Sequence, residues 1–318
     1  MHIFNTPAFS RSHRNENTNL RNSPVLDNVK PKLSGTEGKA TARALATQGH
    51  EVVLVGRNPA KTEEVARQIG ARGVLVGDLS ELREVRRVAD EFRDRYGRLD
   101  VLINNAGAMF QERRETAEGL EMTWALNHLS PFVLTHELMS LLLVTPQARV
   151  ITLSSMMHGM GRIRFDDPEF RRGGYNGWAA YAQSKLANIL FARELARRGG
   201  GLHSYALHPG VVATSFSSTL AGPIGQTYKV VDRFSVTPEV GAQTSVYLAS
   251  TTDPLPNGGY FVSSKPAPAS ARALDDGAAA RLWALSDKYL ANIPASSSPT
   301  WPEILREVHD LTHDTECG

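Results

Sequence analysis

Tyr181 and Lys185 are the two residues whose types and spacing most directly suggest chemistry. They are four positions apart, about one turn of an α-helix, so on a helix both side chains project from one face. An ammonium group beside a phenol favours the phenolate and so lowers the phenol pKa. A tyrosine adjusted in this way can give and take a proton near neutral pH. Taken alone the spacing is weak evidence, because a surface aromatic packed on a lysine stem has the same spacing.

Small, amide and hydroxyl residues accompany this pair, most of them directly after a short apolar run. Residues 100–103 and 149–153 are each typical of a buried strand. A serine hydroxyl close to the Tyr–Lys pair can polarise a carbonyl group. In chain order the accompanying residues are Asn105, Ala106, Gly107, Asn127, Ser154 and Ser155, and the motif His208-Pro209-Gly210 follows the pair.

In this order the motifs resemble the short-chain dehydrogenase/reductase family. The long insert between Ser155 and Tyr181, together with residues 259–262 and 280–283, is similar to its retinol-dehydrogenase-like branch and related bacterial members. The resemblance runs from about residue 38 to about residue 290. It implies a single Rossmann-like domain of the α/β class, with a doubly wound parallel sheet.

The resemblance also implies a role for each candidate catalytic residue. Tyr181 would exchange a proton with the substrate oxygen, and Lys185 would lower the Tyr181 pKa and bind the nicotinamide ribose. Ser155 would hold the substrate oxygen; Ser154 is its rival, but the family places its serine second in this pair. Asn127 would support a water molecule that relays protons to Lys185.

Arg57 is the residue that bears on the choice of cofactor. It follows the strand-like residues 51–55, and in dinucleotide-binding sheets the end of this strand meets the adenosine ribose. An arginine there pairs with a 2′-phosphate, which favours NADP over NAD. Asp78 matches the family position that contacts the adenine amino group, with a simple turn carboxylate as the alternative. The further cofactor contacts that the resemblance implies are Asn105, Ala106, Gly107, Tyr181, Lys185, Pro209, Gly210 and Thr214.

The expected phosphate-binding loop departs from the family pattern. The family has a strand, then Thr-Gly-x-x-x-Gly-x-Gly, then a helix whose N-terminus faces the pyrophosphate. Here Gly38 matches the last glycine, Gly35 is nearby, and Glu37 stands where a small apolar residue is usual. The preceding run 25–31 is a poor strand that ends in proline. Three explanations stay open: Gly35 serves in a shortened loop, the region binds a dinucleotide poorly, or the natural start has been replaced or misread.

Composition agrees with one globular α/β domain. The chain has 318 residues and a formal net charge of +2, which does not suggest a nucleic-acid-binding or membrane-surface protein. The single cysteine, Cys317, excludes an internal disulfide and fits a reducing compartment. No apolar run reaches the length of a membrane span, and the first twenty residues lack the apolar block of a secretion signal. We therefore expect a cytoplasmic protein, and the few scattered histidines give no metal-ligand spacing.

The expected organisation is a flexible extension at residues 1–30, the Rossmann domain at 31–293 and a tail at 294–318. Strands are expected at 51–55, 73–76, 101–104, 149–154, 203–208 and 260–262, alternating with helices, which argues for a parallel sheet. Ser80 is the expected cap of the helix that ends near Tyr96. Residues 214–236 are irregular, and the family places its substrate lid there.

Two functions remain open at this stage. The first is an NADP(H)-dependent oxidoreductase acting on a small lipophilic carbonyl or alcohol, since Met156, Met160, Phe216 and Tyr228 suggest an apolar pocket. The second is a non-catalytic protein of the same fold with impaired cofactor binding, acting as a ligand- or partner-binding module. Members of the family usually form dimers or tetramers, so a homo-oligomer is compatible with the resemblance. His158 and His208 are expected to be structural, because the tyrosine already fills the acid–base role.

Overall fold

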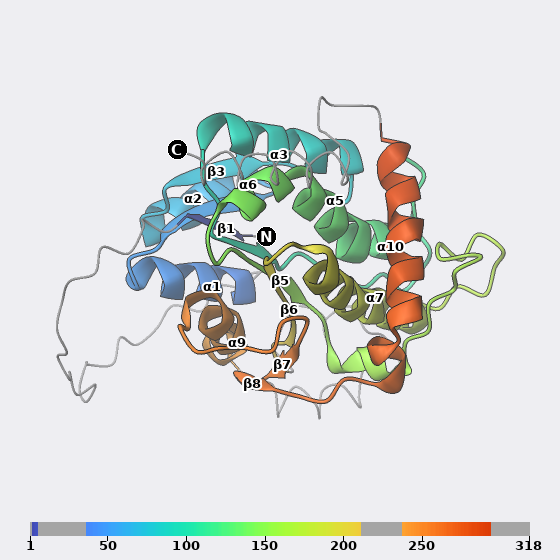
Figure 1. Cartoon of the computed structure of the whole chain (residues 1–318). Helices are drawn as coiled ribbons and strands as arrows, with labels where there is room; N and C mark the ends of the chain where they lie inside the picture. Colours follow the sequence, from blue (N-terminus) through green and yellow to red (C-terminus); the bar gives the residue numbers. More distant parts are fainter. Residues whose placement is uncertain (1, 6–35, 211–236, 294–318) are drawn as a thin grey trace, which may run out of the picture.

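The computed structural model describes residues 2–5, 36–210 and 237–293. In this part of the chain, helices cover both faces of an eight-stranded sheet with the order β3-β2-β1-β4-β5-β6-β7-β8 (Figure 1). The strands are β1 His2–Asn5, β2 Glu51–Gly56, β3 Gly73–Val76, β4 Val101–Asn104, β5 Arg149–Leu153, β6 His203–His208, β7 Tyr260–Val262 and β8 Lys265–Pro266. The α-helices are α1 Thr36–Thr47, α2 Pro59–Ile69, α3 Leu82–Arg95, α4 Met122–Trp124, α5 Ser130–Glu137, α6 Met139–Val144, α7 Gly177–Arg198, α9 Pro238–Ser250 and α10 Asp276–Ala291. A π-helical turn, Ala125–Leu129, joins α4 to α5, and 3-10 turns occur at Met156–Met160 and Ala271–Leu274.

The expected parallel sheet is confirmed for its main strands. Strands β2 and β3 pair in parallel, as do β4, β5, β6 and β7 in succession. Strand β1 lies antiparallel between β2 and β4, and β8 pairs antiparallel with β7 at the edge. Because β1 opposes both neighbours, β2 and β4 still run in the same direction, and the carboxyl ends of the parallel strands meet at one edge of the sheet.

The position of β1 corrects one sequence-based expectation. Residues 1–30 were expected to form a flexible extension, yet residues 2–5 form a strand. In its register Asn5 lies opposite Glu51 of β2, and Phe4 lies opposite Val101 of β4. Four residues are too short for a periodic pattern, and their pairing is made with residues distant in the chain, so no local signal announces this strand. The expected run 25–31 lies outside the described residues.

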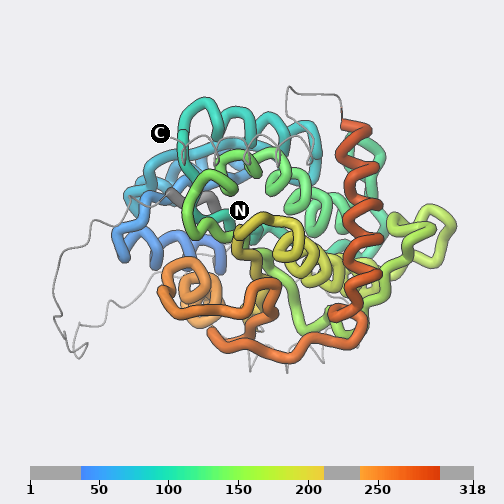
Figure 2. Tube along the Cα trace, in the orientation of Figure 1, coloured from blue at the N-terminus to red at the C-terminus, as the bar shows by residue number. Residues whose placement is uncertain are grey.

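Alternating side chains of the central strands supply two cores. Val53, Leu102 and Val150 pack on the face covered by α3, α5 and α7. Their neighbours in the chain, such as Leu54, Ile103 and Ile151, pack on the other face with side chains of α1, α2 and α9. This period of two, with both sets apolar, is typical of strands buried on both faces. Helix α7 lies between the sheet and α10, and most of its length is buried (Figure 2).

The start of α3 differs from the expected serine cap. Its N-cap residue is Glu81, without a side-chain cap bond, and the Ser80 hydroxyl donates 2.7 Å to Asp78 instead. The carboxylate of Glu118 accepts hydrogen bonds from the backbone amides of Leu82 and Arg83, at 2.8 and 2.9 Å. An acid 36 residues downstream therefore satisfies amides that a helix start leaves free.

Candidate active site

The carboxyl edge of the sheet brings most of the expected site residues together. Asn105 follows β4, Ser155 follows β5, and Pro209 follows β6. Tyr181 and Lys185 come from the first half of α7, which packs against β5 and β6. Ligands of open α/β sheets bind in the crevice outside this edge. The sequence motifs therefore converge at the place where a dinucleotide is bound in such folds.

Tyr181 and Lys185 lie on one face of α7, as their spacing predicts. Asn176 caps this helix by accepting a 3.0 Å hydrogen bond from the Ala179 amide, so the pair begins in the second turn. The Lys185 Nζ atom is 5.5 Å from the centre of the Tyr181 ring. Gly161 lets the insert approach this turn, because a Cβ atom there would stand 2.4 Å from the Ala182 carbonyl oxygen.

Lys185 is a buried lysine with only 4% of its surface exposed. Its Nζ donates 3.1 Å to the backbone carbonyl of Leu153. Burial lowers the pKa of Lys185 to about 8, and the carboxylate of Glu37 opposes that shift. A lysine in this state carries its charge near neutral pH but can release its proton easily, as a group beside a proton-transfer site should.

The two serines after β5 have different environments. The Ser154 hydroxyl donates 2.7 Å to the backbone carbonyl of Lys185, which fastens β5 to α7. The Ser155 hydroxyl accepts a 3.3 Å hydrogen bond from the Met157 amide and keeps its own proton for another acceptor. This arrangement favours Ser155 as the group that holds a substrate oxygen, and it gives Ser154 a structural task.

Asn127 sits in the π-helical turn Ala125–Leu129 and is fully buried. Its side-chain oxygen accepts 2.8 Å from the Ala108 amide, and its nitrogen donates 2.9 Å to the Ala108 carbonyl and 2.9 Å to the Ser184 hydroxyl. Ser184 in turn donates to the Tyr181 carbonyl at 2.8 Å. Asn127 thus joins the loop after β4 to the helical turn that carries the Tyr–Lys pair. Single π-helical turns occur mostly at functional sites.

The segment after β4 has the form of a cradle. A Cβ atom on Gly107 would lie 3.2 Å from the Lys185 Nζ and 3.3 Å from the Asn127 side-chain oxygen, so a side chain there would fill the crevice beside the lysine. The Asn105 side-chain oxygen is buried without a hydrogen-bond partner, although buried polar atoms are normally paired. The close approach that glycine allows beside Lys185 and the unpaired oxygen of Asn105 both fit a nicotinamide–ribose moiety bound at this edge.

Arg57 and Asp78 stand next to each other after the neighbouring strands β2 and β3. The Arg57 Nη1 and the Asp78 carboxylate are 3.5 Å apart, and the Arg57 side chain is 79% exposed. Asp78 also accepts hydrogen bonds from the Ser80 amide and hydroxyl. Burial raises the pKa of Asp78, but these bonds and the charge of Arg57 outweigh it and hold the pKa below its usual value. The pair presents one cation and one acceptor where an adenosine ribose is expected.

The start of α1 contains the least expected side chain of the site. Gly38 is buried in the first turn, and Glu37 precedes it. Burial raises the pKa of Glu37 to about 7, and the charge of Lys185 opposes that shift. Gly35 and Thr214 lie outside the described residues, as do Phe216 and Tyr228. Gly210, the last residue described before that gap, has φ of 95°, a conformation that glycine adopts without strain.

His158 makes bonds that explain its burial without any catalytic task. Its Nε2 accepts 3.1 Å from the Ser270 amide, so Nδ1 carries the proton and donates 2.8 Å to the Ser155 carbonyl. Burial, followed by the charges of His158 and Lys185, lowers the pKa of His208 to about 4. Both histidines therefore fit the structural role that the sequence suggested.

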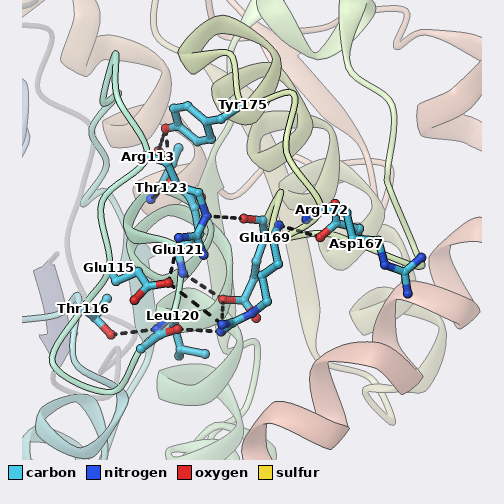
Figure 3. A network of polar contacts seen from close by, with 12 residues as sticks. Arg113, Glu115, Thr116, Leu120, Glu121, Thr123, Asp167, Glu169, Arg172 and Tyr175 are labelled. Carbon is cyan, nitrogen blue, oxygen red and sulfur yellow. Dashed lines mark hydrogen bonds and ion pairs between the residues drawn. The ribbon is translucent and has the colours of Figure 1, made fainter.

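The insert between β5 and α7 is held by buried acids that sequence reasoning missed. Glu169 accepts hydrogen bonds from the Glu121 amide at 2.9 Å and from the Tyr289 hydroxyl at 3.0 Å, and pairs with Arg171 at 2.9 Å. Figure 3 shows Glu121 and Glu169 at the centre of this network, with Tyr175 above them. The Tyr175 hydroxyl donates 2.9 Å to the Phe110 carbonyl. The network joins the insert to the loop after β4 and to α10, which makes one wall of the site a fixed structure.

None of the helices in the described part of the chain is both long and apolar enough to cross a membrane. Within the same ranges, no group of three or more His, Cys, Asp or Glu side chains could hold a metal ion.

Comparison with known proteins agrees with this geometry. Residues 34–222 match the model of the short chain dehydrogenase family. The chain is 41% identical over 268 residues to retinol dehydrogenase 12 of Bos taurus, covering 80% of this chain and 82% of the relative. It is 40% identical over 255 residues to a Streptomyces sp. (strain C5) protein to which a daunorubicin C-13 ketoreductase activity is assigned, covering 78% of this chain and 87% of the relative.

Solved structures show the same fold. The crystal structure of an uncharacterised Mycobacterium paratuberculosis protein matches with a TM-score of 0.67 and 37% identity, covering 82% of this chain and 91% of that chain. The complex of Pseudomonas aeruginosa RhlG with NADP matches with a TM-score of 0.58 and 24% identity, covering 71% and 91%. The chain therefore belongs to the short-chain dehydrogenase/reductase family, in its retinol-dehydrogenase-like branch, and is an NAD(P)-dependent oxidoreductase.

Proposed function

We propose that this protein is an NADP(H)-dependent oxidoreductase that interconverts a lipophilic carbonyl compound and its alcohol. The observation that carries the proposal is the convergence of Ser155, Tyr181 and buried Lys185 at the carboxyl edge of the sheet, braced by Asn127. Carbonyl reduction requires a hydrogen-bond donor for the substrate oxygen, a proton donor and a cation that stabilises the donor's anion, and Ser155, Tyr181 and Lys185 are groups of these three kinds.

Each residue has a defined task in the proposed mechanism. NADPH bound in the crevice would supply the hydride. Ser155 donates a hydrogen bond to the substrate oxygen and so favours the build-up of negative charge on it. Tyr181 gives its phenolic proton to that oxygen in reduction and removes it in oxidation. Lys185 stabilises the phenolate that remains, because its positive charge stands on the same face of α7.

Arg57 supports a preference for NADP over NAD. It is the charged side chain directly after β2, and its guanidinium is exposed and within reach of an incoming phosphate. A guanidinium binds a phosphate through paired, charge-assisted hydrogen bonds. The absence of a carboxylate at positions 56–58 removes the group that would accept the free 2′-hydroxyl of NAD.

An apolar substrate is supported by the surface beside the site and by the relatives. Met156 and Met160, in the turn that follows Ser155, have exposed fractions of 59% and 69%, and Leu274 is 50% exposed. The two methionines belong to a turn that packs against α7, as does the turn that carries Leu274. The names of two relatives specify retinol and the C-13 ketone of daunorubicin, and retinol is a lipophilic alcohol. We propose that the enzyme is cytoplasmic, because a chain with a single cysteine fits a reducing compartment.

Cofactor binding and turnover, measured separately, test the proposal. NADPH added to purified protein should give saturable fluorescence enhancement, and hydrophobic aldehydes and ketones such as retinal should then be reduced. The Tyr181→Phe variant should keep the binding signal and lose turnover by roughly 10²–10⁴-fold. Binding without turnover of any carbonyl or alcohol, or no binding up to millimolar NADPH, would instead support the non-catalytic alternative.

A further inference from the structure

Glu37 places a carboxylic acid where the cofactor's phosphates are expected. It lies in the first turn of α1, directly before buried Gly38. The backbone amides of a helix start have no partner within the helix, and the helix dipole gives this end a partial positive charge. In dinucleotide-binding folds the pyrophosphate occupies this position.

The Glu37 side chain is built into the protein interior. Its Oε1 atom is buried and has no hydrogen-bond partner, a rare state for a carboxyl oxygen. Glu37 is also close enough to Lys185 for each to act on the other's pKa. The Glu37 carboxyl group, at the start of α1, is therefore in electrostatic contact with Lys185 of the Tyr–Lys pair.

The charged groups around α1 leave Lys185 as the relevant counter-charge among the described residues. Lys39, on α1 itself, donates 2.7 Å to Gln68 of α2. Glu239 begins α9, the helix that packs along α1, and it is exposed. His208, at the end of β6, stays neutral because burial lowers its pKa to about 4. Burial raises the pKa of Glu37 to about 7 in spite of Lys185, so both protonation states are present near neutral pH.

An ionised Glu37 and a bound pyrophosphate would repel each other. Both are anions that seek the same helix start, and like charges in a water-poor site repel strongly. A neutral carboxyl group removes the repulsion and offers one O–H donor to a phosphate oxygen. In the free protein the charge of Lys185 favours the ionised form of Glu37 and partly offsets the effect of burial.

We propose that Glu37 makes dinucleotide binding proton-coupled: the cofactor binds only to protein in which the Glu37 carboxylate has taken up one proton from solvent. This rests on the proposed function, since it concerns how the same site accepts NADP(H). Above pH 7 the carboxylate of the free enzyme is an anion in the first turn of α1, where the pyrophosphate is expected. The affinity for the cofactor therefore falls by about tenfold for each pH unit above 7.

Titrations of NADP⁺ into the intact protein between pH 6 and 8.5 test this coupling. The wild type should lose about tenfold in affinity per pH unit above 7, whereas Glu37→Gln should keep the low-pH affinity throughout. Glu37→Val, which places an apolar side chain at the same position, should behave like Glu37→Gln. Glu239→Gln, which removes an exposed acid from the first turn of α9, should keep the wild-type slope. Because the 2′-phosphate itself titrates near pH 6, the difference between wild type and Glu37→Gln is the quantity to compare.

Calorimetry gives a second readout that does not depend on turnover. At pH 8, the binding enthalpy of the wild type should vary with the ionisation enthalpy of the buffer by an amount equal to about one proton taken up. Glu37→Gln should show no such dependence. Equal affinities and equal proton uptake in wild type and Glu37→Gln would overturn the proposal while leaving the oxidoreductase function intact. Failure of every variant to bind NADP⁺ at any pH would overturn both.

Discussion

The Ser154 hydroxyl donates a 2.7 Å hydrogen bond to the backbone carbonyl of Lys185. The bond ties the end of β5 to the turn of α7 that carries the proposed proton-transfer pair. Within the described ranges, the hydroxyl oxygen of its neighbour Ser155 accepts a hydrogen bond from the Met157 amide and donates none. Adjacent residues of the same type thus have separable functions, one in holding the site and one in touching the substrate.

Substitution of each serine by alanine should separate these functions. Ser155→Ala should lower kcat by roughly 10²–10³-fold, because it removes a donor to the developing oxyanion. Ser154→Ala should lower the free energy of unfolding by about 1 kcal/mol and leave most of the activity. Steady-state kinetics and urea denaturation of both variants measure the two effects. The reverse result, with Ser154 essential and Ser155 dispensable, would reassign the substrate contact.

Lys185 should give the protein a distinctive stability profile at alkaline pH. Its pKa is lowered from 10.5 to about 8 by burial, so between those values the unfolded chain binds a proton that the folded protein has released. Stability should therefore rise as the pH increases from about 8 to 10.5. Lys185→Met should lack this rise, be more stable than wild type at pH 7, and be inactive. Denaturation midpoints of both proteins, measured at half-unit pH intervals, test this prediction. If the midpoints of the two proteins changed with pH in the same way, the lowered pKa of Lys185 would be contradicted.

Arg57 should set the choice between the two nicotinamide cofactors. Arg57→Ala removes charge-assisted hydrogen bonds to the 2′-phosphate, each of which contributes about 1.5–3 kcal/mol. The affinity for NADPH should fall by about 10- to 100-fold, with little change for NADH. Arg67→Ala is a suitable control, since Arg67 lies on α2 and pairs with Glu64. An unchanged ratio of NADPH to NADH affinity would show that the 2′-phosphate binds elsewhere.

Glu169 should be far more important to stability than its exposed neighbour in the network. Glu169→Ala leaves the Glu121 amide and the Tyr289 hydroxyl without their acceptor and should lower the free energy of unfolding by about 2–6 kcal/mol, at about 1–3 kcal/mol for each unsatisfied donor. Glu115 pairs with Arg113, but its side chain is 46% exposed. Glu115→Ala should therefore lower the free energy of unfolding by no more than about 1 kcal/mol. Guanidinium denaturation distinguishes the two. Similar losses for both variants would mean that Glu169 does not organise the insert.

Much of the parallel sheet could be predicted because its signals are local. The runs 73–76 and 101–104 have the predicted limits, since apolar strands are read from neighbouring residues. The Tyr181–Lys185 pair lies on one helix face for the same reason. The family resemblance named Asn127 as a candidate site residue, but its hydrogen bond to Ser184 was not predicted and no spacing in the chain would have shown it.

The features that escaped prediction depend on contacts between distant residues. Glu118 reaches the start of α3 from 36 positions away, and a preceding serine is the ordinary local signal for such a cap. In the sequence Glu169 is one charged residue in a polar stretch. Only the fold shows that its carboxylate accepts hydrogen bonds from the Tyr289 hydroxyl and the Glu121 amide. Strand β1 pairs with β2 and with β4, and both of these strands are distant from it in the chain. The burial of the Glu37 Oε1 atom likewise depends on neighbours that the local sequence does not show.

The π-helical turn Ala125–Leu129 has a consequence for how this site tolerates change in evolution. Such a turn holds one residue more than an α-helical turn, so losing a single residue would relax it to regular helix. The helical residues before and after the turn would keep their relative orientation, but the residues left in the turn would be redistributed around the helix axis, and Asn127 would no longer face both Ala108 and Ser184. One lost codon could thus disable the enzyme without removing any residue of its chemistry.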